Sequence, residues 1–207
     1  NLEAALDICV AVKFANAGQV CVTGDRFYVH ESMHEKFVDG FAVRAKALKL
    51  GHGLDEASQM GPLINARRIA AIDGIVAEAR RRGGRVVTGG ERPSGKNKGF
   101  FYSPTVIANL PDDALALAEE NFGPIAAITP FQTDDEVYAR ANSTELGLSA
   151  YAFTQSARRM RETVARTTLG EGVHVTVSSG VCDLAQAGSA GELLRLSEGA
   201  LYWAKQH

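Results

Sequence analysis

One cysteine, Cys21, stands where this chain of 207 residues could hold a nucleophile. It lies in the stretch FANAGQVCVTGDR at residues 14–26, shortly after Gly18 and Gln19. The alternating segment that follows, residues 26–30, predicts a β-strand, so the thiol is expected in a loop between a helix and a sheet. Backbone N–H groups in such a loop stabilise both a thiolate and the oxyanion that forms on its substrate. Cys21 is therefore the candidate catalytic nucleophile.

The spacing F-x-N-x-G-Q-x-C-x(4)-R around Cys21 resembles the active-site signature of the aldehyde dehydrogenases. Three later segments resemble the same family in the same order: GHGLDEASQMGPLIN at 51–65, ENFGP at 120–124 and GLSAYAFT at 147–154. Over residues 1–166 the chain looks like the catalytic domain of a bacterial aldehyde dehydrogenase. It is most similar to the succinate-semialdehyde type.

This resemblance implies covalent oxidation of a small aldehyde substrate to a carboxylic acid, with NAD or NADP as the hydride acceptor. Cys21 would attack the aldehyde, and its backbone N–H would form half of the oxyanion hole. In the E-x-F-G-P segment, Glu120 would bind the nicotinamide ribose and Phe122 would pack near the ring. Thr23 occupies the place where some succinate-semialdehyde enzymes carry a second, redox-active cysteine, so no such switch is expected.

The same resemblance predicts missing machinery. In this family the general base, the oxyanion asparagine and the nucleotide-binding fold lie before the nucleophile, and we expect none of them within residues 1–207. This chain alone is therefore expected to bind no dinucleotide and to have little or no turnover. Two function classes stay open: an oxidoreductase fragment that works with a complementary nucleotide-binding piece, and a recombined, non-catalytic α/β module for folding or interaction.

The end of the chain, residues 167–207, resembles a different family. Its segments VTVSSG and ALYWAK are similar to the strand and the last helix of the GGDEF domain of diguanylate cyclases. The GGDEF loop that binds metal and GTP is absent from the sequence, which excludes cyclase activity. Alternating residues predict a strand at 173–179, and we expect this grafted strand and helix to complete the sheet and cover its edge. The predicted domains are thus 1–166 and 167–207.

Helices and strands that would position the candidate residues alternate along residues 1–166 with short connections. Apolar periodicity and capping residues predict helices that begin at residue 2, at Ser32 in a capping box with Glu35, at Asn65, at residue 114, at Thr133 and at Ser156. Strands are predicted at 26–30, 86–88, 100–107, 125–131 and 146–154. The fold class is therefore α/β: a mostly parallel sheet with helices on both faces, as in the catalytic domain of aldehyde dehydrogenases.

Several other features look like sites but have structural explanations. Cys9 lies on the apolar stripe of the first helix and is expected to be a small buried hydrophobe. The three arginines at 80–82 come before two glycines, where cations complement the end of a helix. The segment 90–97 nearly spells a phosphate-binding loop, but Asn97 stands where Ser or Thr is required and no helix pattern follows. The five histidines show no metal-ligand spacing, so no metal site is predicted.

Composition and charge exclude several classes of partner. An apolar share of 45% with 22% charged residues is typical of a globular chain. A net charge of −2 and a pI near 6.2 give no general attraction to nucleic acid or to an anionic membrane. No signal peptide and no apolar run of the ~20 residues that a membrane helix needs is found. Three cysteines without paired spacing predict a reducing, cytoplasmic location, and homo-oligomerisation stays open.

Overall fold

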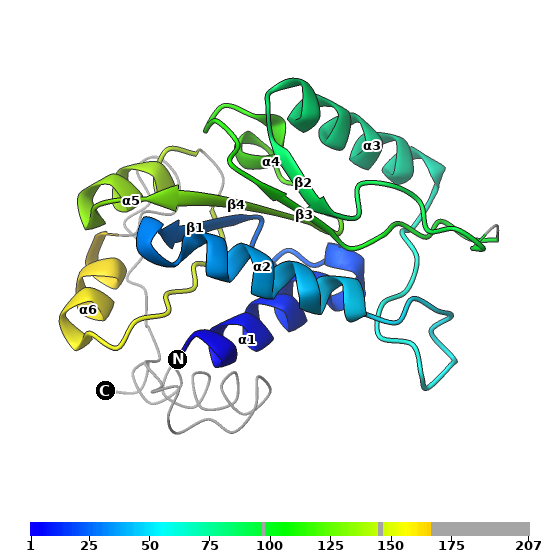
Figure 1. Cartoon of the computed structure of the whole chain (residues 1–207), viewed down its shortest axis with the longest axis horizontal. Coiled ribbons are helices and arrows are strands. Elements are labelled where there is room, and N and C mark those ends of the chain that lie inside the picture. The colour runs from blue at the N-terminus through cyan, green and yellow to red at the C-terminus, as the bar shows by residue number, and fades with distance from the viewer. Residues whose placement is uncertain (97, 145–146, 167–207) are drawn as a thin grey trace.

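The computed structural model describes residues 1–96, 98–144 and 147–166 (Figure 1). The strands of this part are β1 (Arg26–His30), β2 (Arg85–Thr88), β3 (Thr105–Ala108) and β4 (Ile125–Phe131). The helices are α1 (Leu2–Phe14), the 3-10 turn η1 (Ala15–Gly18), α2 (Glu31–Ala47), α3 (Ala66–Arg81), α4 (Leu115–Ala118), α5 (Asp134–Ala141) and α6 (Ala157–Arg166).

The four strands form one sheet in the order β1-β4-β3-β2. β4 pairs in parallel with both β1 and β3, whereas β2 pairs antiparallel with β3. Parallel neighbours need a crossover between them, and the helices supply it. The prediction of an α/β fold with a mostly parallel sheet is confirmed.

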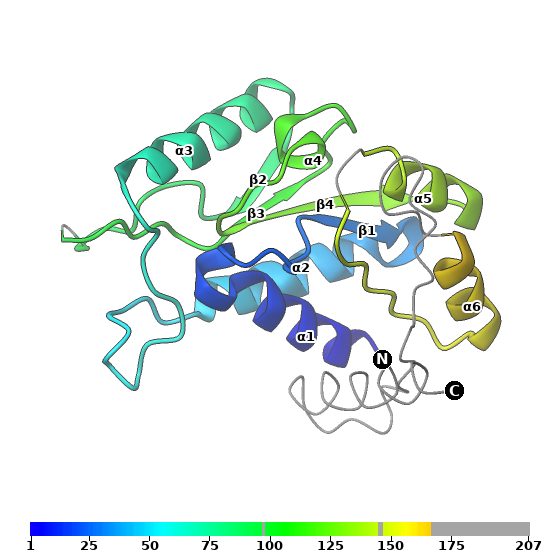
Figure 2. The ribbon, with the colours of Figure 1, turned by 180° about the vertical axis from the view of Figure 1, so that it is seen from behind.

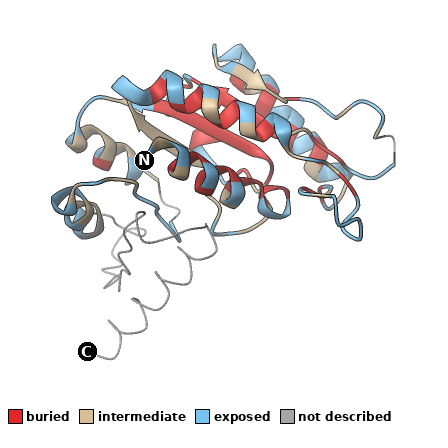
Figure 3. Cartoon of the chain, turned by 60° about the horizontal axis from the view of Figure 1, so that its bottom comes forward, coloured by how far each residue is buried: buried red, intermediate tan, exposed pale blue. Residues whose placement is uncertain are grey.

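Helices cover both faces of this sheet. α1 and α2 lie along one face and α3 and α4 along the other, as the two opposite views show (Figures 1 and 2). α2 contacts all four strands, α3 contacts β2, and α4 contacts β4. Every residue of β3 is buried, as are the first five of β4, so the core lies around the two central strands (Figure 3).

Aromatic side chains join the first helix and the first strand to α2. The ring of Phe41 lies 6.1 Å from that of Phe14 on α1 and 5.2 Å from that of Phe27 on β1, both in edge-on geometry. Such pairs add specific geometry to the burial of large apolar surfaces. The elements on either side of the Cys21 loop are therefore both fixed to one helix.

Local sequence signals explain most helix ends. The Asn65 side chain caps α3 by accepting from the N–H of Arg68, and Thr133 caps α5 in the same way. α3 ends in arginines and is followed by Gly83 at φ +84°, a left-handed position that glycine adopts without steric cost. These three features were predicted from the sequence.

Three predictions about elements are wrong. α2 begins at Glu31 rather than after a Ser32 cap, because the ring of His30 accepts from the Ser32 N–H and caps the helix itself. The extended pattern at 100–107 becomes a strand only from Thr105. Residues 147–154, the described part of the strand predicted at 146–154, form no strand.

Within the described ranges, no helix combines the length and the apolar character that crossing a membrane requires. The predicted strand at 173–179 and the rest of 167–207 lie outside the described residues.

Candidate active site

The loop that carries Cys21 begins with an unusual backbone. Asn16, Ala17 and Gly18 have φ values of 47°, 56° and 72°, so three consecutive residues are left-handed. This conformation costs about 1–2 kcal/mol for a residue with a Cβ, and the surrounding structure must hold it. It turns the chain sharply out of α1 before the cysteine.

Cys21 itself is exposed, in a turn closed by a 3.0 Å hydrogen bond from the N–H of Thr23 to the carbonyl of Val20. The Thr23 hydroxyl donates to the same carbonyl. From the other side, the Tyr151 hydroxyl donates to the Val22 carbonyl at 2.8 Å. The thiol is therefore presented on a hydrogen-bonded turn between α1 and β1, the position that the sequence predicts.

The glutamine of the motif fixes this loop to a distant part of the chain. The Gln19 side-chain carbonyl accepts from the N–H of Ile64 at 2.9 Å, and its amide donates to the carbonyls of Asn16 and Pro62. Ile64 immediately precedes the cap of α3. The start of α3 therefore supports the Cys21 loop.

The segment that carries Glu120 and Phe122 connects α4 to β4 and packs directly on the Cys21 loop. A Cβ built on Gly18 would lie 2.1 Å from the carbonyl oxygen of Gly123, so only glycine permits this approach. Phe122 has φ +43°, and the Arg68 guanidinium of α3 lies 5.9 Å from the centre of its ring. Arg68 thus contacts this segment from the start of α3, the same helix end that binds Gln19.

A cavity of about 1110 Å³ is lined by all three predicted site residues, Cys21, Glu120 and Phe122. Its walls also include β1 and the segment 147–155. Glu120 and Cys21 are exposed, whereas Phe122 is partly buried. The structure thus brings a thiol, a carboxylate and an aromatic ring to one cavity. A carboxylate accepts hydrogen bonds from hydroxyl groups and a ring packs on planar ligands, so the set fits a ribose joined to an aromatic base.

Two charged residues beside this site were not singled out from the sequence. Lys13 is fully buried and its ammonium contacts a carboxylate oxygen of Asp25 at 2.6 Å. Burial lowers the pKa of Lys13, and the charge of Asp25 opposes this effect. The available signal was the lysine's place on the apolar stripe of α1, four residues after Cys9 and one before Phe14.

Cys9 and the glycine-rich loop at 90–96 have structural explanations in the fold as well. Cys9 is buried, and desolvation raises the pKa of its thiol to about 12, which makes it a poor nucleophile. No helix follows the glycine-rich loop at 90–96 within residues 98–104. Among the described residues, no group of three potential ligands could hold a metal ion.

Comparison with known proteins gives the family of the chain. The model of the aldehyde dehydrogenase family matches residues 1–186. Succinate semialdehyde dehydrogenase of Acinetobacter baylyi is 39% identical over 160 residues, which cover 77% of this chain and 32% of that protein. The D-glyceraldehyde dehydrogenase (NADP(+)) of Picrophilus torridus is 38% identical over 174 residues, covering 83% of this chain and 35% of that protein.

Solved structures of dehydrogenases share the fold of this chain. The aldehyde dehydrogenase of Mycobacterium tuberculosis, solved in complex with NAD+, superposes with a TM-score of 0.79 at 33% identity, covering 82% of this chain and 35% of that one. A 3,6-anhydro-L-galactose dehydrogenase in complex with NAP gives 0.79 at 36% identity, covering 83% and 36%.

The chain spans about a third of the length of these relatives, 32% of the first. The family match also runs to residue 186, beyond the domain boundary predicted at 166. Matched along most of its length in both sequence and fold, the chain belongs to the aldehyde dehydrogenase family.

Proposed function

We propose that this chain is the thiol-bearing part of an NAD(P)-dependent aldehyde dehydrogenase that oxidises a small aldehyde to a carboxylic acid. Cys21 is the nucleophile, and Glu120 and Phe122 contact the nicotinamide end of the cofactor. The observation that carries the proposal is the cavity that these three side chains share, in a chain of this family.

The role of Cys21 follows from covalent catalysis. Its thiolate attacks the aldehyde carbon and forms a C–S bond, while a backbone N–H of the turn donates to the oxygen that becomes negative. Loss of hydride from the same carbon leaves a thioester. Water then adds to the thioester, the C–S bond breaks, and the acid and the free thiol are released.

The cofactor supplies the acceptor for the hydride when it is bound. Glu120 would hold the cofactor by accepting hydrogen bonds from its ribose hydroxyls, and the Phe122 ring would pack near the nicotinamide. Phe122 is suited to this because Arg68 lies over its ring and also donates to the neighbouring Asn121 carbonyl. The chain's contribution is to fix the relative positions of the thiol and the cofactor's reactive end.

We also propose that residues 1–207 alone turn over aldehyde slowly or not at all. A complementary nucleotide-binding part would supply the remaining cofactor contacts and the base that activates water. The relatives, of which this chain spans about 32% to 35%, support this division of labour. Within this proposal the substrate is a small aldehyde, as the names of the relatives suggest.

The test is the reactivity of Cys21 in the folded chain. Iodoacetamide labelling at pH 7, read by peptide mass spectrometry, should alkylate Cys21 at least tenfold faster than the thiol of a free peptide of residues 14–26. In a preserved site the turn presents the exposed sulfur to the cavity in a reactive position, which the free peptide does not hold. Cys9 should stay unlabelled, which reports that the chain remains folded.

Equal rates in the chain and the peptide would refute the proposal and favour the second candidate, a non-catalytic α/β module. Calorimetry with NAD gives an independent check. We expect no submillimolar binding by residues 1–207, and such binding would contradict the division of labour.

A further inference from the structure

We propose that the Lys13–Asp25 ion pair is a positioning device that holds the Cys21 loop in register with the segment carrying Glu120 and Phe122. The inference rests on the proposed function, because it assigns the pair a role only if these loops form one site. It adds two residues that touch neither substrate nor cofactor and act through the loops that they join.

Both side chains of the pair are largely removed from solvent. The Lys13 side chain is 0% exposed and that of Asp25 only 18%. A buried charge costs free energy unless it is paired, and apolar residues of similar volume often serve stability at least as well. Stability alone therefore gives a weak reason for a lysine at this point of the α1 stripe. A geometric role gives a stronger one.

The two residues stand at the two ends of the Cys21 loop. Lys13 lies in the last turn of α1, and Asp25 directly precedes β1. Their 2.6 Å contact therefore closes residues 14–24 into a loop whose ends cannot move apart without breaking the pair. The left-handed turn and Cys21 both lie inside this closed loop.

The second oxygen of the Asp25 carboxylate extends the device to the other segment. It accepts the backbone N–H of Asn121 at 3.0 Å, and Asn121 lies between Glu120 and Phe122. One carboxylate thus binds Lys13 through Oδ1 and the segment that carries Glu120 and Phe122 through Oδ2. Charge-assisted hydrogen bonds of this kind are short and directional, as positioning requires.

Gly18 and Gly123 pack against each other without a hydrogen bond between them, and the neighbouring side-chain hydrogen bonds serve other parts of the fold. The Asn121 side chain donates to the Ala116 carbonyl at 3.0 Å, which ties it to α4 rather than to the Cys21 loop. Gln19 and Arg68 join the two loops only indirectly, through the start of α3. The hydrogen bond from the Asn121 N–H to Asp25 joins the Cys21 loop directly to the segment that carries Glu120.

The test replaces the pair by apolar residues of similar size, Lys13→Met with Asp25→Leu, so that no charge is left unpaired. Amide hydrogen exchange resolved to residues 117–124 and Cys21 alkylation at pH 7 are measured in the 207-residue chain. We expect exchange of the Asn121 amide to rise at least tenfold relative to α3 amides. Cys21 alkylation should fall at least fivefold, toward the rate of the free peptide.

Leu6→Ala is the matched control, because Leu6 is 1% exposed on the same helix but lies about two turns before Lys13. It lowers stability through a cavity and should leave both readouts within twofold of the wild type, measured against α3 amides. The single variant Asp25→Asn, which keeps the side-chain volume, is measured in parallel in case the double variant does not fold, and should shift both readouts in the same direction.

The inference is overturned if both pair variants leave the Asn121 amide and the Cys21 rate within twofold of the wild type, or if Leu6→Ala gives the same changes. A wild-type Cys21 that reacts no faster than the peptide refutes the proposed function instead. In that case amide exchange at Asn121 alone decides whether the pair positions the loop.

Discussion

At the scale of single residues, the candidate site depends on one very close approach between two loops. Gly18 combines a left-handed φ of 72° with a distance that leaves no space for a Cβ beside Gly123. Cys21 and Glu120 are both exposed, so packing of their own side chains does not hold them in place. Their positions are instead fixed by backbone contacts such as this one.

We predict that Gly18→Ala lowers the free energy of unfolding by about 2–4 kcal/mol, from the left-handed backbone and the overlap with the Gly123 carbonyl. It should also slow Cys21 alkylation, because the two loops must separate. Urea titration and peptide-resolved labelling measure the two effects.

Gly74→Ala is the control for this change. Gly74 lies inside α3 with no atom within 4 Å of an added Cβ, so alanine should stabilise the helix by about 0.5–1 kcal/mol. If Gly18→Ala proved as mild as Gly74→Ala, the close approach would not be a constraint on the loops.

Residue types alone predict only part of this site. Cys21, Glu120 and Phe122 stand in short contiguous motifs, so the sequence singles them out. The Lys13–Asp25 pair joins the two ends of a loop, and its hydrogen bond to Asn121 crosses 96 positions of the chain. Such contacts depend on tertiary packing, and no spacing rule predicts them.

At the scale of elements, helix ends decide which segments support the site. Asn65 caps α3, and residues around this cap contact the Cys21 loop through Gln19 and the Glu120 segment through Arg68. The sequence predicts this cap because Asn stands directly before an apolar periodic run. It misplaces the start of α2 because a histidine cap is uncommon, and the Ser32 to Glu35 spacing fits a capping box equally well.

We expect Asn65→Ala to cost about 1 kcal/mol of stability, since it leaves the N–H of Arg68 without its acceptor. Ser32→Ala should cost less than about 0.5 kcal/mol, because Ser32 lies within α2 and another residue caps that helix. Thermal unfolding of the two variants side by side measures the difference. A larger loss for Ser32→Ala would restore the capping box as the start of α2.

The extended segment at 147–154 shows that a sequence pattern alone does not determine whether a segment becomes a strand. Its residues suit a strand, but a strand also needs a partner with free backbone groups. The Tyr151 and Ser149 hydroxyls instead bond the Val22 carbonyl, so the segment lies over the Cys21 turn as an irregular wall of the cavity.

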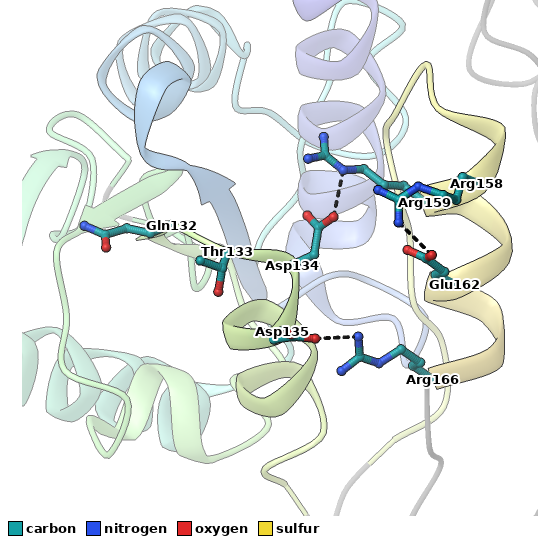
Figure 4. Close-up of a pocket in the computed structure, with 8 residues that line it drawn as sticks. All are labelled: Gln132, Thr133, Asp134, Asp135, Arg158, Arg159, Glu162 and Arg166. Carbon is teal, nitrogen blue, oxygen red and sulfur yellow. Dashed lines mark hydrogen bonds and ion pairs between the residues drawn. The ribbon is translucent and has the colours of Figure 1, made fainter.

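At the scale of the whole molecule, a dense core contrasts with a charged periphery. Strands β3 and β4 lie in the buried centre, whereas α5 and α6 meet through polar contacts and a cation over a ring (Figures 3 and 4). Arg159 pairs with Asp134 at 2.9 Å and Arg166 with Asp135 at 2.7 Å. These pairs border a polar cavity of about 340 Å³.

Exposed ion pairs contribute little individually and weaken as salt screens them over ~10 Å at 0.1 M and ~3 Å at 1 M. We therefore predict that raising NaCl from about 0.1 to about 1 M accelerates amide exchange in α6 at least threefold and leaves α3 unchanged. The variant Asp135→Asn, which removes one pair, should show faster exchange at low salt and a smaller response to salt. An α6 insensitive to both changes would mean that apolar contacts, rather than these charges, hold the helix beside α5.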